Sequence, residues 1–280
     1  MIVLERLGTL DVSAASGCVA HGGRLHVVAD DGLALHVYDL VGRPVARHRL
    51  FDGELPDEPK ARKKAKPDLE ALALLPDGSL LALGSGSSER RDRGAWIHLE
   101  HGQTDVRLVE LGSLYERLAR EFTELNIEGV AVHGSSLVLA QRGNGAKREN
   151  ALIHLDLAVA VEGIAGGRLA AEAITAIHPL ALGELDGVPL SITDLAPARD
   201  GTLRFAAAAE DTEDPYLDGV CKGSVLGLLA DEGRVEAWWP LSHVTKIEGL
   251  TELPDGTYRL VADADDPAVM APLFGARMPR

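Results

Sequence analysis

The chain has 280 residues, with 43 Asp or Glu against 28 Lys or Arg and a formal net charge of −15. Such an acidic chain is not expected to bind nucleic acid, because basic surfaces bind phosphate backbones, and no apolar run approaches the ~20 residues that span a bilayer. Two cysteines, Cys18 and Cys221, are too few for a disulfide framework, and Met1–Leu10 lacks the apolar core of a signal peptide, so we expect a cytoplasmic protein with no membrane partner.

Five similar motifs recur along the chain, each followed by an apolar run, a turn and a second strand-like run. In chain order they are Ser16-Gly17, Asp68-Leu69-Glu70-Ala71-Leu72, Asn126-Ile127-Glu128-Gly129-Val130, Ile192-Thr193-Asp194-Leu195 and Lys246-Ile247-Glu248-Gly249-Leu250. If Ser16, Glu70, Glu128, Asp194 and Glu248 are equivalent, the units are about 50 to 65 residues long, close to the lengths found in β-propellers.

The units divide into short strand-like runs bounded by Gly, Pro and Asp. In the second to fourth units these are Glu70–Leu75, Ser79–Leu83, Ala95–Leu99 and Val106–Leu111; Gly129–Val132, Ser136–Ala140, Ala151–Leu155 and Arg168–Ile177; and Asp194–Pro197, Thr202–Ala208, Ser224–Leu229 and Arg234–Trp239. The fifth unit offers only Gly249–Leu253, Tyr258–Ala262 and Ala271–Ala276. We expect Ile2–Leu7 to supply its missing strand, since closing the ring removes two sheet edges.

One amphipathic helix is expected over Leu114–Leu125. Ser113 and Glu116 fit a capping box, and Leu114, Leu118, Phe122 and Leu125 fall on one helical stripe. The sequence therefore predicts an all-β fold, a monomeric five-bladed β-propeller that forms a single domain over residues 1–280. It would have four-stranded blades, an N-terminal strand closing the last blade and one short inserted helix near 114–125.

The repeated acids should share one place in this fold. The innermost strand of each propeller blade begins at the mouth of the central channel, so Glu70, Glu128, Asp194 and Glu248 should ring that mouth. The loops after the second strands open on the same face and are long and polar, as binding loops often are. At ~4–8 Å and an effective dielectric near 20, each pair of carboxylates would repel by about 2–4 kcal/mol.

Three arrangements would relieve this repulsion: a bound cation, raised pKa values, or intervening Lys and Arg. A divalent ion, most simply Ca²⁺, prefers oxygen ligands, and the candidate ligands are Glu128, Asp194, Glu248 and Asn126. The candidate basic residues are Lys66, Arg142 and Lys246. Alternatively, each acid accepts hydrogen bonds from the next blade and only fastens the ring.

Charge along the predicted functional face is uneven. The run Pro59–Pro67 carries five Lys or Arg, whereas the loop that begins at Glu210 is acidic. A cation held on the acidic side and an anion on the basic side would suit a phosphorylated ligand, although the basic run also fits a solvated loop. The sequence contains no Gly-x-Ser-x-Gly elbow and no zinc-ligand spacing.

The motifs around Glu70, Glu128, Asp194 and Glu248 resemble the phytase-like, esterase-like propeller group of bacteria. This resemblance implies channel-facing acids and calcium-supported hydrolysis of phosphate or other esters. More distantly, the chain resembles the gluconolactonase-like propellers. They hold one divalent ion with Glu, Asn and Asp from different blades, a set that Glu128, Asn126 and Asp194 would supply here.

The first functional hypothesis is therefore a divalent-metal-dependent hydrolase of a small anionic ester, with a phosphoester favoured. Glu70 and Glu128 would be catalytic, and Lys66, Arg142 and Lys246 would bind the anionic substrate. The second hypothesis is a non-catalytic propeller that binds a ligand or protein, with structural acids. A lactonase or a glycosidase is the third, although only 4% of the residues are the aromatics that usually stack on sugars.

Overall fold

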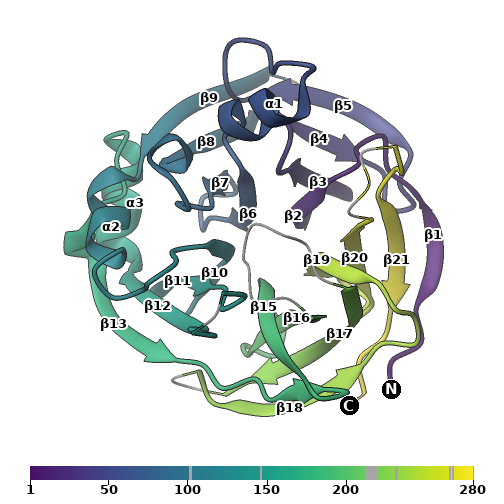
Figure 1. Ribbon diagram of the computed structural model, residues 1–280. Coiled ribbons are helices and arrows are strands. Elements are labelled where there is room, and N and C mark those ends of the chain that lie inside the picture. The colour runs from purple at the N-terminus through teal and green to yellow at the C-terminus, as the bar shows by residue number, and fades with distance from the viewer. Residues whose placement is uncertain are drawn as a thin grey trace.

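The computed structural model describes residues 1–100, 103–145, 147–211, 220–230, 233–264, 266 and 268–279. Within them, the strands form five antiparallel sheets arranged as blades around a common axis (Figure 1). This is the five-bladed β-propeller that the sequence predicts.

Each blade runs from an innermost to an outermost strand in chain order. Blades 1 to 3 are β2 (Ala15–His21), β3 (Arg24–Ala29), β4 (Ala34–Tyr38) and β5 (Pro44–Arg49); β6 (Leu69–Leu74), β7 (Leu80–Gly84), β8 (Arg93–Glu100) and β9 (Gln103–Glu110); and β10 (Ile127–His133), β11 (Ser136–Gln141), β12 (Ala151–Asp156) and β13 (Ile174–Pro179). Blade 4 is β15 (Val188–Pro197), β16 (Leu203–Asp211), β17 (Val220–Leu229) and β18 (Val235–Pro240), with the two-residue β14 (Glu184–Leu185) added beside β15.

Blade 5 closes the ring with the N-terminus, as predicted. It comprises β19 (Lys246–Glu252), β20 (Tyr258–Asp263), β21 (Pro272–Ala276) and β1 (Glu5–Thr9). In the β1–β21 pair, Glu5 lies opposite Gly275 and Thr9 opposite Pro272. The closing strand begins three residues later than predicted, because Ile2 instead bridges to Leu241 at the end of blade 4.

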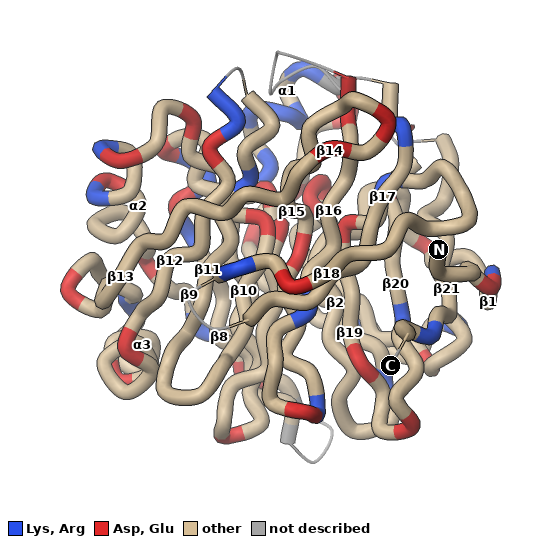
Figure 2. The backbone as a smooth tube through the Cα atoms, turned by 90° about the horizontal axis from the view of Figure 1, so that it is seen from below, with Lys and Arg blue, Asp and Glu red and all other residues tan. Residues whose placement is uncertain are grey.

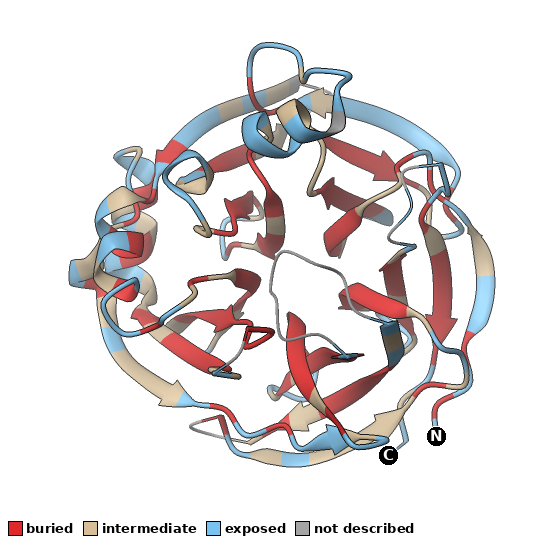
Figure 3. Cartoon of the chain, in the orientation of Figure 1, coloured by how far each residue is buried: buried red, intermediate tan, exposed pale blue. Residues whose placement is uncertain are grey.

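Apolar packing between neighbouring blades explains why the repeat specifies the fold. The described buried residues form five clusters, one for each interface between two blades. Inner strands are therefore buried on both faces, as β7 is, whereas the outer strand β5 is mostly exposed (Figure 3). No unit buries its apolar faces alone, so the blades stabilise one another around the ring.

Every innermost strand carries a β-bulge where it reaches the channel mouth. The register shifts fall at Ser16-Gly17, Glu70, Glu128, Thr193 and Glu248. A bulge re-aims the side chain of the extra residue, and in three blades that residue is a glutamate. In blade 4 it is Thr193, so Asp194 is not equivalent to the three glutamates but to the residue that follows them.

The residue after the bulge lies against the next blade. A Cβ added at Gly129 would lie 2.8 Å from the Leu195 backbone nitrogen, and one at Gly249 would lie 2.3 Å from the Ser16 carbonyl oxygen. Innermost strands of neighbouring blades thus meet here, which accounts for the glycine in two of the repeated motifs.

The predicted helix is shorter than expected. Helix α2 spans Gly112–Leu118 with Leu111 as its N-cap, so Ser113 lies inside the helix and no side chain caps it. The chain then continues in turns to Leu125. The predicted apolar stripe is nevertheless buried, and Phe122 and Leu125 pack with α2 between blades 2 and 3.

Two further helices were not predicted. Helix α1 (Pro59–Ala65) forms in the basic run, where Glu58 caps it by accepting from the amides of Lys60 and Ala61. Helix α3 (Leu157–Ala165) is capped by Asp156 and is followed by the short 3₁₀ helix η2 (Ala171–Ala173); a second 3₁₀ helix, η1, spans Glu89–Arg91. The predicted strand Arg168–Ile177 was therefore wrong in its first half. In the described part of the chain, no helix has the length and apolar character to cross a membrane.

Candidate functional site at the channel mouth

A cavity of about 940 Å³ lies at the mouth of the channel. Its walls come from innermost strands of blades 1, 2, 3 and 5, from α1 and from the segment that follows α2. Figure 2 shows α1 and its Lys and Arg positions at one face of the ring. Ten Asp or Glu and six Lys or Arg residues line the cavity, so acidic residues outnumber basic ones in its wall.

Seven of the eight residues predicted from the sequence line this cavity. They are Lys66, Glu70, Asn126, Glu128, Arg142, Lys246 and Glu248. The eighth, Asp194, is 1% exposed and is not among the lining residues that the structure describes. Its Oδ1 accepts from the Leu195 amide and its Oδ2 from the Leu250 amide, both at 2.8 Å. Asp194 therefore joins blade 4 to blade 5.

The first group of charges, here called the lysine cluster, comprises Asp30, Lys66, Asp68, Glu70 and Arg91. Lys66 Nζ contacts Asp30 Oδ2 and lies 2.8 Å from Asp68 Oδ1, while Arg91 Nη1 lies 2.6 Å from Asp68 Oδ2. Burial alone would lower the pKa of Lys66, but Asp30 and Asp68 outweigh it and hold that pKa above its usual range. The ammonium therefore remains charged.

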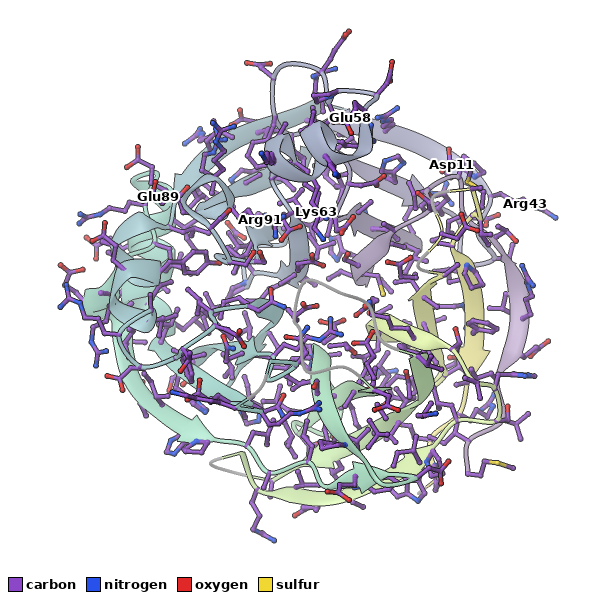
Figure 4. All side chains as sticks on the ribbon, in the orientation of Figure 1. Asp11, Arg43, Glu58, Lys63, Glu89 and Arg91 are labelled. Carbon is purple, nitrogen blue, oxygen red and sulfur yellow. The ribbon has the colours of Figure 1, made fainter. Side chains whose placement is uncertain are left out.

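Asp68 adopts a backbone conformation that L-residues rarely take, with φ of 57°. This conformation costs a non-glycine residue about 1–2 kcal/mol, and it holds the Asp68 carboxylate under Lys66 and Arg91. The guanidinium of Arg91 also donates to the Lys63 carbonyl at 3.1 Å, which ties α1 to the cluster (Figure 4).

Glu70 differs from the rest of the lysine cluster, since no hydrogen bond or ion pair from the described residues reaches its carboxylate. Burial raises the pKa of Glu70 well above its usual value, and the nearby charges of Glu128, Asp68 and Asp30 raise it further. One carboxylate oxygen each from Asp30, Asp68 and Glu70 lies within 4.8 Å of the others. The Glu70 carboxylate therefore binds a proton more readily than an exposed glutamate does.

The second group, here called the arginine cluster, comprises Glu128, Arg142, Glu210, Lys246 and Glu248, none more than 7% exposed. Arg142 Nη1 lies 3.1 Å from Glu128 Oε1 and 3.8 Å from Glu248 Oε1, and its Nη2 contacts Glu210 Oε2. Lys246 Nζ lies 3.0 Å from Glu248 Oε1 and 3.5 Å from Glu210 Oε1. Two cations thus separate three carboxylates.

Burial and pairing set the proton affinities in this cluster. Burial raises the pKa of Glu128 to about 7, although Arg142 opposes the rise. Burial would also raise the pKa of Glu210, but Arg142 and Lys246 outweigh it and bring that pKa below its usual value. The cluster therefore contains one carboxyl that titrates near neutrality beside one that stays ionised.

The predicted metal ligands do not fit a divalent ion. Arg142 lies between Glu128 and Glu248, and Lys246 lies between Glu248 and Glu210. Asn126 presents its amide nitrogen to Glu128 Oε1 at 2.6 Å. Intervening basic residues thus relieve part of the repulsion between the acids, and the raised pKa of Glu128 relieves another part. Asp30, Asp68 and Glu70 offer hard oxygen donors of the kind that Ca²⁺ prefers, but an ion there would have to displace Lys66.

A second pattern in the sequence identifies cavity residues that were not predicted. Two positions before the bulge of each blade stand Ala14, Asp68, Asn126, Ser191 and Lys246, and four of these five line the cavity. Asp68 could have been identified from this spacing. Asp30 comes from a turn, Arg91 from η1 and Glu210 from the second strand β16, all outside the repeated motif.

A solved structure supports the propeller fold. The glutaminyl cyclase of Myxococcus xanthus superposes with a TM-score of 0.58 at 15% identity, covering 99% of this chain and 96% of that chain. A luciferin-regenerating enzyme gives 0.46 at 13% identity over 95% and 78%, and virginiamycin B lyase of Staphylococcus aureus gives 0.39 at 11% over 100% and 75%. At 15% identity the glutaminyl cyclase structure supports the fold alone, and it does not test the phytase-like assignment.

Among curated proteins, none matches the sequence. The model of a family of unknown function, DUF6929, matches residues 11–278, and the chain belongs to this family.

Proposed function

We propose that the channel-mouth cavity is an active site for general acid–base catalysis and that Glu70 is the residue that exchanges the proton. The observation that carries this proposal is the contrast between two acids. Asp194 has both oxygens bonded to backbone amides, whereas the Glu70 carboxylate lines a large cavity without a hydrogen-bond partner among the described residues. A raised pKa in a cavity is typical of a catalytic acid or base.

Hydrolysis of a small ester is the reaction class that these groups can perform. The Glu70 carboxylate would accept a proton from water while the water oxygen attacks the ester, and the protonated Glu70 would return that proton to the departing alcohol. Negative charge that develops on the ester oxygen would be stabilised by the nearby Lys66 ammonium, which its partners keep protonated.

Metal-assisted hydrolysis is a second candidate, favoured by the three carboxylates that lie within 4.8 Å of one another. Asp30, Asp68 and Glu70 would hold the ion, which would supply Lewis-acid activation of water. Adding Ca²⁺ or EDTA separates the two candidates: EDTA leaves the rate of the acid–base reaction unchanged and abolishes that of the metal-assisted reaction.

The test is a panel of carboxylic esters, phosphoesters and lactones, together with a glutaminyl peptide because one structural neighbour is named a glutaminyl cyclase. Glu70→Gln should lower kcat at least ~10²-fold on any substrate that the wild type turns over. Glu184→Gln, an exposed change in β14, is the matched control and should leave kcat unchanged. Full activity of Glu70→Gln would refute the assignment, and a panel without turnover would favour the non-catalytic propeller.

A further inference from the structure

The fixed positive charges of the cavity are already neutralised. At least five of its six Lys or Arg residues form ion pairs with carboxylates, as Arg62 does with Asp31 at 3.5 Å and Arg91 with Asp68 at 2.6 Å. An anionic ligand would have to break such a pair, and it would enter a wall in which carboxylates outnumber basic groups. The electrostatics therefore favour a ligand with a positive charge.

Two polar side chains that line the cavity have no partner among the described residues. Asn144 lines the cavity and is 8% exposed, yet its side-chain amide makes no hydrogen bond to the residues that the structure describes. Glu124 also lines the cavity, and its carboxylate likewise receives no hydrogen bond or ion pair from them. Buried amides are nearly always hydrogen-bonded, so a largely buried amide whose free atoms open onto a cavity is available to bind a ligand there.

Glu124 meets the segment that carries Asn144, although the two residues are 20 positions apart in the chain. A Cβ added at Gly145 would lie 1.4 Å from Glu124 Oε2, so the carboxylate rests on the backbone next to Asn144. A residue with a side chain at position 145 would push Glu124 away. The glycine thus allows the Glu124 carboxylate to lie against the segment of Asn144, and both residues line the same cavity.

The same segment supplies an apolar surface. Ala119, Phe122 and Leu125 precede Asn126 in the chain and line the cavity together with Glu124. Phe122 and Leu125 are anchored in the packing between blades 2 and 3, which holds them in place. A ligand bound at Glu124 would therefore lay an apolar portion against these side chains.

We infer that the substrate is a small molecule with a protonated amine and an apolar chain. The ammonium group binds the Glu124 carboxylate and the Asn144 side-chain carbonyl, and the chain lies on Phe122 and Leu125. The inference rests on the proposed function in taking this cavity as the active site, and it replaces the anionic substrate that the sequence suggested.

Two probes of equal chain length and opposite charge test the inference: hexylammonium and hexanoate, titrated at neutral pH by calorimetry. Hexylammonium should bind at least tenfold more tightly than hexanoate, and butylammonium should bind more weakly than hexylammonium. Glu124→Gln and Asn144→Ala should each weaken hexylammonium binding about tenfold, the effect of losing a hydrogen bond to a charged group. Glu184→Gln should change nothing.

Equal binding of the two probes, no binding of either, or unchanged binding by Glu124→Gln would overturn the inference. Thermal unfolding of each variant checks that it folds. Glu70→Gln separates this result from the proposed function, because it should abolish turnover while hexylammonium still binds. If Glu124→Gln loses hexylammonium binding while Glu70→Gln keeps full turnover, the inferred amine site is supported and the catalytic role of Glu70 is refuted.

Discussion

Asp194→Ala should destabilise the propeller although it removes no cavity-lining group. Asp194 Oδ1 accepts the Leu195 amide within β15, and Oδ2 accepts the Leu250 amide of β19 in the next blade. The side chain is 1% exposed, so water cannot replace it. Truncation leaves two buried N–H groups without an acceptor.

An unsatisfied buried donor costs about 1–3 kcal/mol, so the two amides together predict a loss of about 2–6 kcal/mol. That is a large share of the ~5–15 kcal/mol that holds a typical domain folded. Asp194→Asn keeps one carbonyl acceptor and should lose about half as much. Burial already raises the pKa of Asp194, so the neutral side chain of Asn adds no further desolvation cost.

Urea unfolding followed by circular dichroism measures these free energies. Asp105→Ala is the control, because Asp105 is 58% exposed and its ion pair with Arg107 should contribute less than ~1 kcal/mol. If the free energy of unfolding of Asp194→Ala is within about 0.5 kcal/mol of the wild-type value, Asp194 does not stabilise the contact between blades 4 and 5. If it unfolds normally but loses ligand binding, Asp194 belongs to the site as the repeat suggested.

Three further changes probe the clusters. Glu70→Gln should raise the free energy of unfolding by about 1–3 kcal/mol, because it removes a charge within 4.8 Å of those on Asp30 and Asp68; a lower urea midpoint would contradict this. The pKa of Glu128 is about 7 in the folded state against an ordinary value of 4.5, so between these pH values the folded state binds more protons than the unfolded state. The free energy of unfolding should therefore fall as the pH rises from 4.5 to 7, and urea titrations of Glu128→Gln should not show this fall. Arg142→Met should cost about 3–5 kcal/mol, because it leaves buried Glu128 without a cation and Lys246 alone to neutralise Glu210 and Glu248; the urea midpoint should recover in acid.

The propeller could be predicted because the sequence pattern that specifies it is local and recurs in every unit. Each unit has short apolar runs between turn residues, and β1 was deduced from the strand that the last unit lacks. Helix α1 was missed because Pro59–Ala65 carries four basic residues and no apolar stripe. Its formation depends on the Glu58 cap and on contacts with distant residues, such as that of Arg62 with the Asp31 carbonyl.

Pairing within the site depends on contacts that no local pattern reveals. Arg142 and Glu210 are 68 residues apart in the chain, yet their side chains bond directly. Lys66 pairs with Asp30, from a loop in blade 1. The sequence suggested that basic residues could separate the acids. It could not show that the Arg142 side chain would lie between Glu128 and Glu248, where the metal ion was predicted.

The misassigned acid of blade 4 follows from the two-residue period of a strand. In the other motifs an apolar residue, Leu69, Ile127 or Ile247, stands directly before the bulged glutamate, and in blade 4 the matching Ile192 stands before Thr193. A shift by one residue turns a side chain to the opposite face of its strand, so the acidic character of Asp194 was a weaker guide than the apolar residue before the bulge. Thr193 donates to the Ile247 carbonyl at 2.7 Å and brings no charge to the channel mouth. The carboxylate that blade 4 does supply there is Glu210 of β16, which pairs with Arg142, so the second strand takes the part that the innermost strand plays in blades 2, 3 and 5.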